Sequence, residues 1–305
     1  MINLFHINHY NIDTSKFDHV LNGSIVSDFE NEFCRYVGAE HGCGVNSATN
    51  AIFLSLLGKN KTISVPSVIP YVVLNAITLS GNDIDFVDNV DWVGDSYVLH
   101  KFNDYKIIDS AQKVERDQFK KEANPEDLMI FSFYPTKPVG SIDGGMIVSN
   151  DKSKIDWFRS AVLNGTVFSK NNWERKILFP GWKSYLSSSQ AFVAQKNLEK
   201  LEDKNKKLDE IRHYYNSELG IDNSSRHLYR ISTENRDEFI SEMRNREIIC
   251  GIHYTPMHLN PVYCKNSLTL EKSEDVGFKT VSIPFHEMLT DSEISYIIKC
   301  CKELL

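Results

Sequence analysis

The stretch FSFYPTKPVGSIDGGMIVSND, residues 131–151, carries the strongest fold signal in the chain. It joins the end of one apolar run, LMIFSF (128–133), to a second apolar run, GMIVSN (145–150). Both runs have the length and composition of buried β-strands. Between them stands Lys137, and a glycine pair leads directly into the second run. We therefore expect Lys137 in a turn just beyond the end of a buried strand.

On the N-terminal side of this stretch, short apolar runs alternate with helix-like segments from about residue 40. This alternation is typical of an α/β fold, with a mostly parallel sheet covered by helices. The expected helices follow the first two of these strands. The expected strands are 43–45, 62–67, 83–88, 97–100 and 105–109.

Beyond Gly220 the pattern changes to that of a smaller α+β lobe. Residues 186–219 are expected to form one long helix or two in close succession. The final helix should open with a capping box formed by Thr290 and Glu293. We expect a large domain over 1–200, which includes the N-terminal segment, and a small domain over 201–305. The remaining expected elements are strands 228–232, 248–254 and 280–284 and a helix over 236–247.

Composition excludes several classes of protein. The 34 basic and 41 acidic residues give a net charge of −7, which argues against nucleic acid as a partner. The six cysteines form no C-x-x-C pair, so neither a metal site nor a disulfide framework is expected, and reduced thiols are typical of a cytoplasmic protein. There is no leader-like start and no apolar run of membrane-spanning length. We therefore expect a soluble, cytoplasmic protein.

Lys137 and Asp109 are the candidate catalytic residues. A lysine at a strand end can have its pKa lowered enough to act as a nucleophile and later as a proton carrier. The ordinary alternative is a surface lysine in a turn. Asp109 ends the strand YKIID, where a carboxylate faces the crevice in which such sheets bind ligands. The ordinary alternative is a helix cap.

A candidate anion site lies at NSATN, residues 46–50, where a helix is expected to begin. The free N–H groups and the dipole of a helix N-terminus favour an anion. Thr49 adds a hydroxyl here, and Ser132 offers another near Lys137. Serine and threonine caps are common, so this pattern indicates an anion site only together with the candidates Lys137 and Asp109.

In this order, the segments resemble the sugar aminotransferases of the DegT/DnrJ/EryC1/StrS family, which are fold type I pyridoxal-phosphate (PLP) enzymes. The resemblance covers nearly the whole chain. It is carried by NSATNAIFLSLL, VPS…NAI…GNDIDFVD, IIDSAQ, FSFYPTKPVGSIDGGMIVSND, GWKSYLSSSQAFVAQKNLEKLED, GIHYTPMHLNPVY and VSIPFHEMLTDSEISYII.

The resemblance implies specific roles around the cofactor ring. Lys137 would form the Schiff base to PLP. Asp109 would face the pyridine nitrogen and keep it protonated, so that the ring accepts electrons from the substrate. Gln112 would contact the phenolic oxygen of the ring.

For the phosphate of PLP, the resemblance implies the Ala48 amide, Thr49 and Ser132. Lys183 stands where the family has a polar residue that reaches the phosphate of the neighbouring subunit. The resemblance therefore implies a homodimer with shared active sites.

Two features depart from the family pattern. Where the family places an aromatic residue on the pyridine ring, this chain has Pro70 followed by Tyr71, so either Tyr71 stacks on the ring after a local shift or the ring packs on aliphatic atoms. Only Asn89 to Tyr105 separates strand 83–88 from the strand that carries the aspartate, several tens of residues fewer than usual. Strands 97–100 and 105–109 are therefore expected to pair antiparallel, unless one of them is lost from the sheet.

The implied reaction moves an amino group from L-glutamate to a keto group of a nucleotide-linked deoxysugar, with PLP as carrier. One alternative is a PLP-dependent sugar dehydratase, which has histidine in place of the lysine, so Lys137 argues against it. Another is a catalytically impaired PLP-binding or regulatory protein. Retention of the lysine, the aspartate and the phosphate residues together argues against that alternative.

Overall fold

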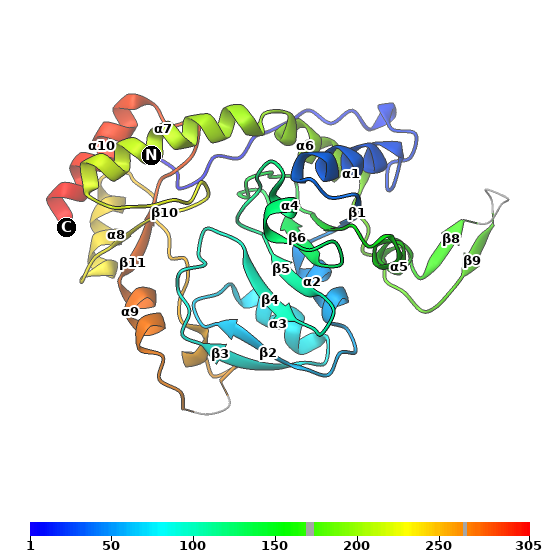
Figure 1. Cartoon of the computed structure of the whole chain (residues 1–305). Coiled ribbons are helices and arrows are strands. Elements are labelled where there is room, and N and C mark those ends of the chain that lie inside the picture. The colour runs from blue at the N-terminus through cyan, green and yellow to red at the C-terminus, as the bar shows by residue number, and fades with distance from the viewer. Residues whose placement is uncertain (169–173, 265–266) are drawn as a thin grey trace.

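The computed structural model describes residues 1–168, 174–264 and 267–305, and it has a large and a small lobe (Figure 1). A long helix, α7 (Leu201–Leu219), spans the small lobe and reaches toward the large one. Both chain ends lie on the small-lobe side of the molecule (Figure 1). The division into domains at residue 200 stays a prediction.

The central sheet of the large lobe is mixed. Among the described residues, its strand order is β1-β7-β6-β5-β4. Only β5 and β6 pair in parallel, which corrects the expectation of a mostly parallel sheet. The reason is that β4 joins β5, and β6 joins β7, through connections without a helix. The strands are β1 (His41–Val45), β4 (Tyr97–Lys101), β5 (Lys106–Asp109), β6 (Leu128–Ser132) and β7 (Gly145–Ser149).

The shortened segment 89–105 forms the antiparallel hairpin expected from its length. The β4–β5 connection is closed by the Phe102 amide, which donates to the Tyr105 carbonyl at 2.8 Å. The register places Tyr97 opposite Asp109. Strands β2 (Thr62–Pro66) and β3 (Asp83–Val87) form a separate parallel pair, joined by helix α3 (Tyr71–Leu79).

Helices cover both faces of the central sheet. Along β6, Ile130 packs with α2 and α3, whereas Met129 and Phe131 pack with α1 and α6 on the opposite face. This alternation is the side-chain period of a strand and confirms the α/β layering. The helices of the large lobe are α1 (Ser24–Val37), α2 (Ala48–Leu56), α3, α4 (Gln118–Glu122), α5 (Lys152–Val162) and α6 (Ser188–Glu199).

The small lobe packs helices on an antiparallel pair of strands around its own core. The capping box is confirmed, because the Thr290 hydroxyl accepts from the Glu293 amide and the Glu293 carboxylate accepts from the Thr290 amide. Besides α7, its elements are β10 (Tyr229–Ser232), α8 (Arg236–Asn245), α9 (Glu271–Lys279), β11 (Thr280–Ile283) and α10 (Asp291–Leu304).

Two expectations in the C-terminal half are resolved. Residues 186–219 form two helices, α6 and α7, which meet at Lys200. The expected strand over 248–254 was wrong. Its backbone bonds go to different segments, Ile249 to Ile2 and Gly251 to Ser282, so no continuous ladder forms.

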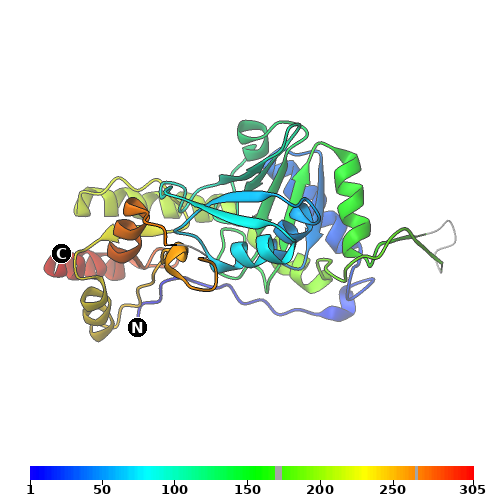
Figure 2. The same ribbon diagram turned by 90° about the horizontal axis from the view of Figure 1, so that it is seen from below.

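A hairpin of β8 (Thr166–Phe168) and β9 (Arg175–Ile177) stands clear of the large lobe (Figure 2). Short 3-10 helices cover Thr14–Lys16 and Met257–Leu259. No helix in the described part of the chain is long and apolar enough to cross a membrane.

Candidate active site

Lys137 lies in the connection between β6 and β7, as expected. The strand pairing extends beyond β6, because the Phe133 amide donates to the Gly144 carbonyl at 2.9 Å. The chain then turns, and the Lys137 amide donates to the Tyr134 carbonyl at 2.9 Å. A Cβ at Gly140 would collide with the backbone oxygen of Pro135, so the tight turn that contains Lys137 requires a glycine at this position.

The surroundings of Lys137 favour the neutral form of its amine. Burial lowers the pKa of Lys137 to about 8, and the Asp109 carboxylate opposes this shift. Lys137 Nζ lies 3.4 Å from Nε2 of His227. An amine with a pKa near 8 is partly neutral at physiological pH, and the neutral form is the one that attacks a carbonyl carbon.

Asp109 is buried at the carboxyl end of β5. Its carboxylate accepts hydrogen bonds from the Ala111 amide at 2.9 Å and from the Tyr97 hydroxyl at 3.0 Å. Burial raises the pKa of Asp109, while these two donors and the charge of Lys137 oppose the rise. The Tyr97 contact was not foreseen, and it follows from the antiparallel register that sets Tyr97 beside Asp109.

Gln112 is buried between the two lobes and is already bonded at both ends of its amide. Its Oε1 accepts from the Gly94 amide at 2.6 Å, and its Nε2 donates to the Tyr254 hydroxyl at 2.9 Å. A side-chain amide nitrogen carries two N–H groups, so one has no partner among the described residues and can serve a ligand. The bond to Gly94 ties Gln112 to the loop before β4.

The candidate anion residues gather where α2 begins. Ser47 caps the helix by accepting from the Asn50 amide. The Ala48 and Thr49 amides before it have no carbonyl partner within the helix, as in the first turn of any helix. A Cβ at Gly145 would lie 2.7 Å from the Ala48 nitrogen, so β7 passes against this helix end. Ser132 pairs with Gly145 across the sheet. Ser132 is thereby brought toward the helix end that bears Ala48 and Thr49.

Tyr71 and Lys183 have fewer contacts that connect them with the candidate anion residues at the start of α2. Tyr71 is the first residue of α3 and is 59% exposed in the single chain. Lys183 is exposed, and its backbone pairs with Leu163 beyond the end of α5. The neighbouring Ser184 carbonyl accepts from the Asn46 amide at 2.8 Å, so this segment runs beside the loop before α2. The roles assigned to both residues stay predictions.

Sequence reasoning missed two histidines of the small lobe. The His227 ring is buried and stacks on Phe5, with 5.6 Å between the ring centroids. Burial and the nearby Lys137 hold the pKa of His227 well below its usual value, and burial lowers the pKa of His253 to about 4. Both rings are therefore neutral at physiological pH. His227 belongs to no spacing motif. His253 lies in GIHYTPMHLNPVY, a segment that carries the family resemblance, but the resemblance assigned this histidine no role.

The residues present fit PLP. An amine of lowered pKa can bond to its aldehyde, a buried carboxylate can face its ring nitrogen, and a helix N-terminus can hold its phosphate. All three lie at one edge of an α/β sheet, the usual place for a ligand in such folds. Fold and site together define a PLP-dependent enzyme.

The chain belongs to the DegT/DnrJ/EryC1/StrS aminotransferase family, whose model matches residues 7–93 and 106–302. It is thus a PLP-dependent aminotransferase. The match breaks at 94–105, which is the segment that contains β4 and the turn before β5. The departure in length noted from the sequence therefore falls on the hairpin.

Characterised relatives span almost the whole chain. It is 25% identical to a UDP-4-amino-4,6-dideoxy-N-acetyl-beta-L-altrosamine transaminase of Campylobacter jejuni, with 95% of this chain and 94% of the relative covered. That alignment has 355 positions, more than the 305 residues here, because the relative has segments that this chain lacks. A GDP-perosamine synthase of Caulobacter vibrioides is 24% identical, with 93% and 91% covered.

Among solved structures, the aminotransferase TlmJ of Streptoalloteichus hindustanus is similar with a TM-score of 0.82 and 20% identity. The similarity covers 99% of this chain and 98% of that one. At this identity the likeness supports the fold, and it confirms the fold type I assignment.

Proposed function

We propose that the protein transfers an amino group from L-glutamate to a keto group of a nucleotide-linked deoxysugar, with Lys137 and Asp109 as catalytic residues. The observation that carries the proposal is the placement of the Lys137 amine, with a pKa near 8, in the same site as the buried Asp109 carboxylate. The sugar as acceptor is suggested by the relatives, whose names include a UDP-sugar transaminase and a GDP-perosamine synthase.

Each residue has a defined task in this proposal. Bound PLP supplies an aldehyde that exchanges between amines and a ring that accepts electrons from the substrate carbon. Lys137 holds the cofactor at rest, and its freed Nζ takes up and returns the proton of the substrate carbon. The Asp109 carboxylate stabilises positive charge on the nitrogen that faces it. The Tyr97 hydroxyl holds that carboxylate in place.

The remaining residues would bind the cofactor without taking part in proton transfer. Gln112 has an N–H group left for the oxygen on the ring. The set proposed for phosphate and ring contacts is Ala48, Thr49, Ser132 and Tyr71 from one chain and Lys183 from its neighbour.

Two half-reactions provide the direct test. The PLP-loaded protein is first treated with L-glutamate, freed of small molecules, and then mixed with a panel of UDP-, GDP- and dTDP-linked keto-sugars. We expect glutamate to convert the absorbance of the cofactor and one class of keto-sugar to restore it, with formation of an amino sugar. Lys137→Ala is the control. Conversion by glutamate without an amino sugar from any member of the panel would contradict the proposed acceptor.

The proposed homodimer can be tested through Lys183. If Lys183 binds the phosphate in the opposite subunit, Lys183→Ala should weaken PLP binding without unfolding the protein. A mixture of Lys183→Ala with Lys137→Ala should regain activity, because one site of each mixed dimer takes both intact residues from different chains. A monomeric protein with full PLP occupancy would rule out the shared site.

A further inference from the structure

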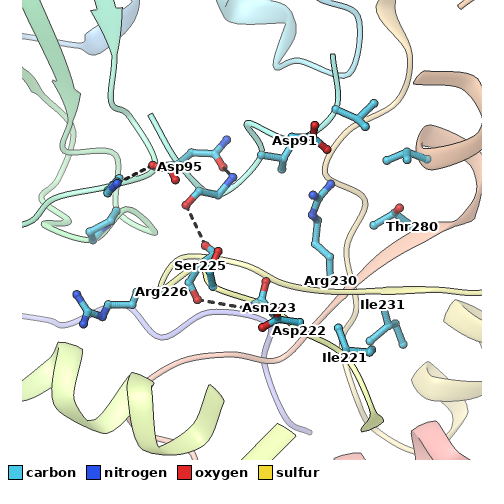
Figure 3. Close-up of a pocket in the computed structure, with 18 of the residues that line it drawn as sticks. Asp91, Asp95, Ile221, Asp222, Asn223, Ser225, Arg226, Arg230, Ile231 and Thr280 are labelled. Carbon is cyan, nitrogen blue, oxygen red and sulfur yellow. Dashed lines mark hydrogen bonds and ion pairs between the residues drawn. The ribbon is translucent and has the colours of Figure 1, made fainter. Parts of the chain in front are cut away.

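The side chain of Arg230 faces the large lobe from strand β10. Successive residues of a strand point to opposite faces. Tyr229 and Ile231 belong to the core of the small lobe, whereas Leu228 packs with the core of the large lobe. Arg230 lies on the same side as Leu228. Figure 3 shows its guanidinium pointing toward Asp91, in the loop that follows β3.

This guanidinium has no partner in the described part of the chain. Its Nη1 is buried and makes no hydrogen bond there. Burial lowers the pKa of Arg230, and Tyr254 and Asp91 oppose this shift. Neither of them forms an ion pair or hydrogen bond with Arg230 among the described residues. Arg230 as a whole is half-buried, and a charge largely removed from water is normally paired in proteins, because that removal is costly. An unpaired arginine in this position points to a partner that comes from outside the chain.

Arg230 lines a cavity of about 640 Å³ between the two lobes. Sites for small molecules have volumes of about 300–1,000 Å³. Other cations on the wall of this cavity are already neutralised: Lys113 lies 2.8 Å from Asp95, and Arg226 lies 2.7 Å from Asp209. The positive charge left for a ligand in the described wall is therefore that of Arg230.

The cavity lies next to the cofactor site, because Gln112, three residues after Asp109, lines its wall and donates to the Tyr254 hydroxyl at 2.9 Å. Burial raises the pKa of Tyr254, Asp109 raises it further, and Arg230 lowers it, so Tyr254 lies within reach of both charges. In the same way, both Lys137 and Arg230 lower the pKa of His253 in addition to the effect of burial. A ligand bound at Arg230 would thus be close to the two proposed catalytic residues.

We propose that Arg230 binds an oxyanion, a carboxylate or a phosphate, of the substrate that enters this cavity. The inference rests on the proposed function, in which both substrates are anionic. L-Glutamate brings carboxylates, and the nucleotide-linked sugar brings a diphosphate. A guanidinium binds either group through two parallel N–H donors, which gives it orientation as well as charge.

The test is calorimetric titration of the PLP-loaded protein with probes for the two sources. Glutarate is a dicarboxylate that lacks an amino group, and UDP, GDP and dTDP represent the diphosphate. We expect Arg230→Gln to weaken binding of one kind of probe by about tenfold or more. Arg230→Lys, which keeps the charge, should lose less. Arg244→Gln, at an exposed site on α8, is the matched control and should bind as the wild type does.

The outcome also identifies the source of the oxyanion. Weaker glutarate binding assigns Arg230 to the amino donor, and weaker nucleotide binding assigns it to the acceptor. If the wild type binds a probe and Arg230→Gln binds it equally well, the inference is overturned while the proposed function stands. If the wild type binds none of the probes, the proposed substrates are wrong and the inference falls with them.

Two further variants separate ligand binding from a structural role. Without a probe, Arg230→Gln should unfold at no lower temperature than the wild type, because it removes a charge that has no partner. A lower unfolding temperature with unchanged probe affinity would mean a structural role and would overturn the proposal. Asp91→Asn should strengthen binding of the same probe, since it removes a like charge from the oxyanion's surroundings. Weaker binding in Asp91→Asn would contradict the proposed oxyanion position.

Discussion

Two connections of the central sheet flank the candidate site, and they differ in how closely they keep to the family. The connection from β6 to β7 carries Lys137 and matches the family model without a break. The hairpin of β4 and β5 stands where the chain is shortened, and residues 94–105 fall outside the match. The side of the site formed by the β6–β7 connection thus follows the family sequence. The side formed by the shortened hairpin, called the rebuilt side below, does not.

The two connections differ in sequence, yet the site retains both Lys137 and Asp109 although the strand beside Asp109 has changed direction. Reversal of β4 brings the first residue of the strand, Tyr97, to the carboxyl end of β5. Tyr97 then donates to Asp109, and Gly94, just before the strand, donates to Gln112. The hairpin and the loop before it thus supply hydrogen bonds to both proposed ring contacts, Asp109 at the end of β5 and Gln112 just beyond it.

The largest effect is expected on the side that follows the family sequence. Lys137→Ala removes both the proposed covalent link and the proposed proton carrier, so amino transfer should fall by at least about 10⁴-fold. The measurement is turnover of the two half-reactions. Lys152→Ala, at an exposed lysine that pairs with Asp156, is the control and should keep full activity. Activity within tenfold of wild type in Lys137→Ala would remove this lysine from the mechanism.

Asp109→Asn should have the next largest effect. A neutral amide cannot stabilise a positive charge on the facing nitrogen, so the rate should fall by about 10²- to 10³-fold. Cofactor binding should remain largely intact, and equilibrium titration with PLP measures it separately from turnover. Asp237→Asn, at an exposed site on α8, is the matched control. Equal turnover in Asp109→Asn and wild type would refute the proposed role.

Tyr97→Phe tests the rebuilt side and should cost about tenfold, the value of one hydrogen bond to a charged group. Loss of this donor leaves the buried carboxylate less well stabilised, so the pKa of Asp109 rises and the charged form is lost at a higher pH. The acid limb of the pH–rate profile should therefore move to higher pH. Tyr105→Phe, in the same hairpin, is the control. A lower rate with an unmoved acid limb would assign Tyr97 a packing role alone.

The smallest effect expected is a shift in the pH dependence of cofactor attachment. With a pKa of about 8, the Lys137 amine becomes neutral as the pH rises through that value. The rate of covalent PLP uptake by the cofactor-free protein should therefore increase with pH and level off above about 8. The Asp109 charge raises the pKa of Lys137, so Asp109→Asn should move this curve to lower pH. A curve still rising near the ordinary lysine pKa would contradict the buried setting of the amine.

The sequence predicted most of the large lobe and the placement of Lys137 because these rest on local patterns. Strand periodicity, the glycine return after Lys137 and the helix start at Ala48 each depend on a few neighbouring residues. The antiparallel pairing of β4 could also be predicted, because the four residues between the expected strands, KFND (101–104), are too few for a helical crossover.

Contacts between residues far apart in the chain could not be predicted from the sequence. The contacts of Tyr97 with Asp109 and of His227 with Lys137 depend on register and on how the lobes pack. The segment 248–254 looks like a strand in sequence, yet it divides its hydrogen bonds between the N-terminus and β11. Such a division has no local signature.

If a complete PLP site is retained beside the shortened hairpin, Lys137 is the lysine that bonds the cofactor. Borohydride reduction of the PLP-loaded wild type, followed by proteolysis and mass spectrometry, tests it most directly. We predict one modified peptide, from the connection between β6 and β7, with the added mass on Lys137. A modified lysine elsewhere in the chain, or no modification in a protein that has bound PLP, would contradict the claim.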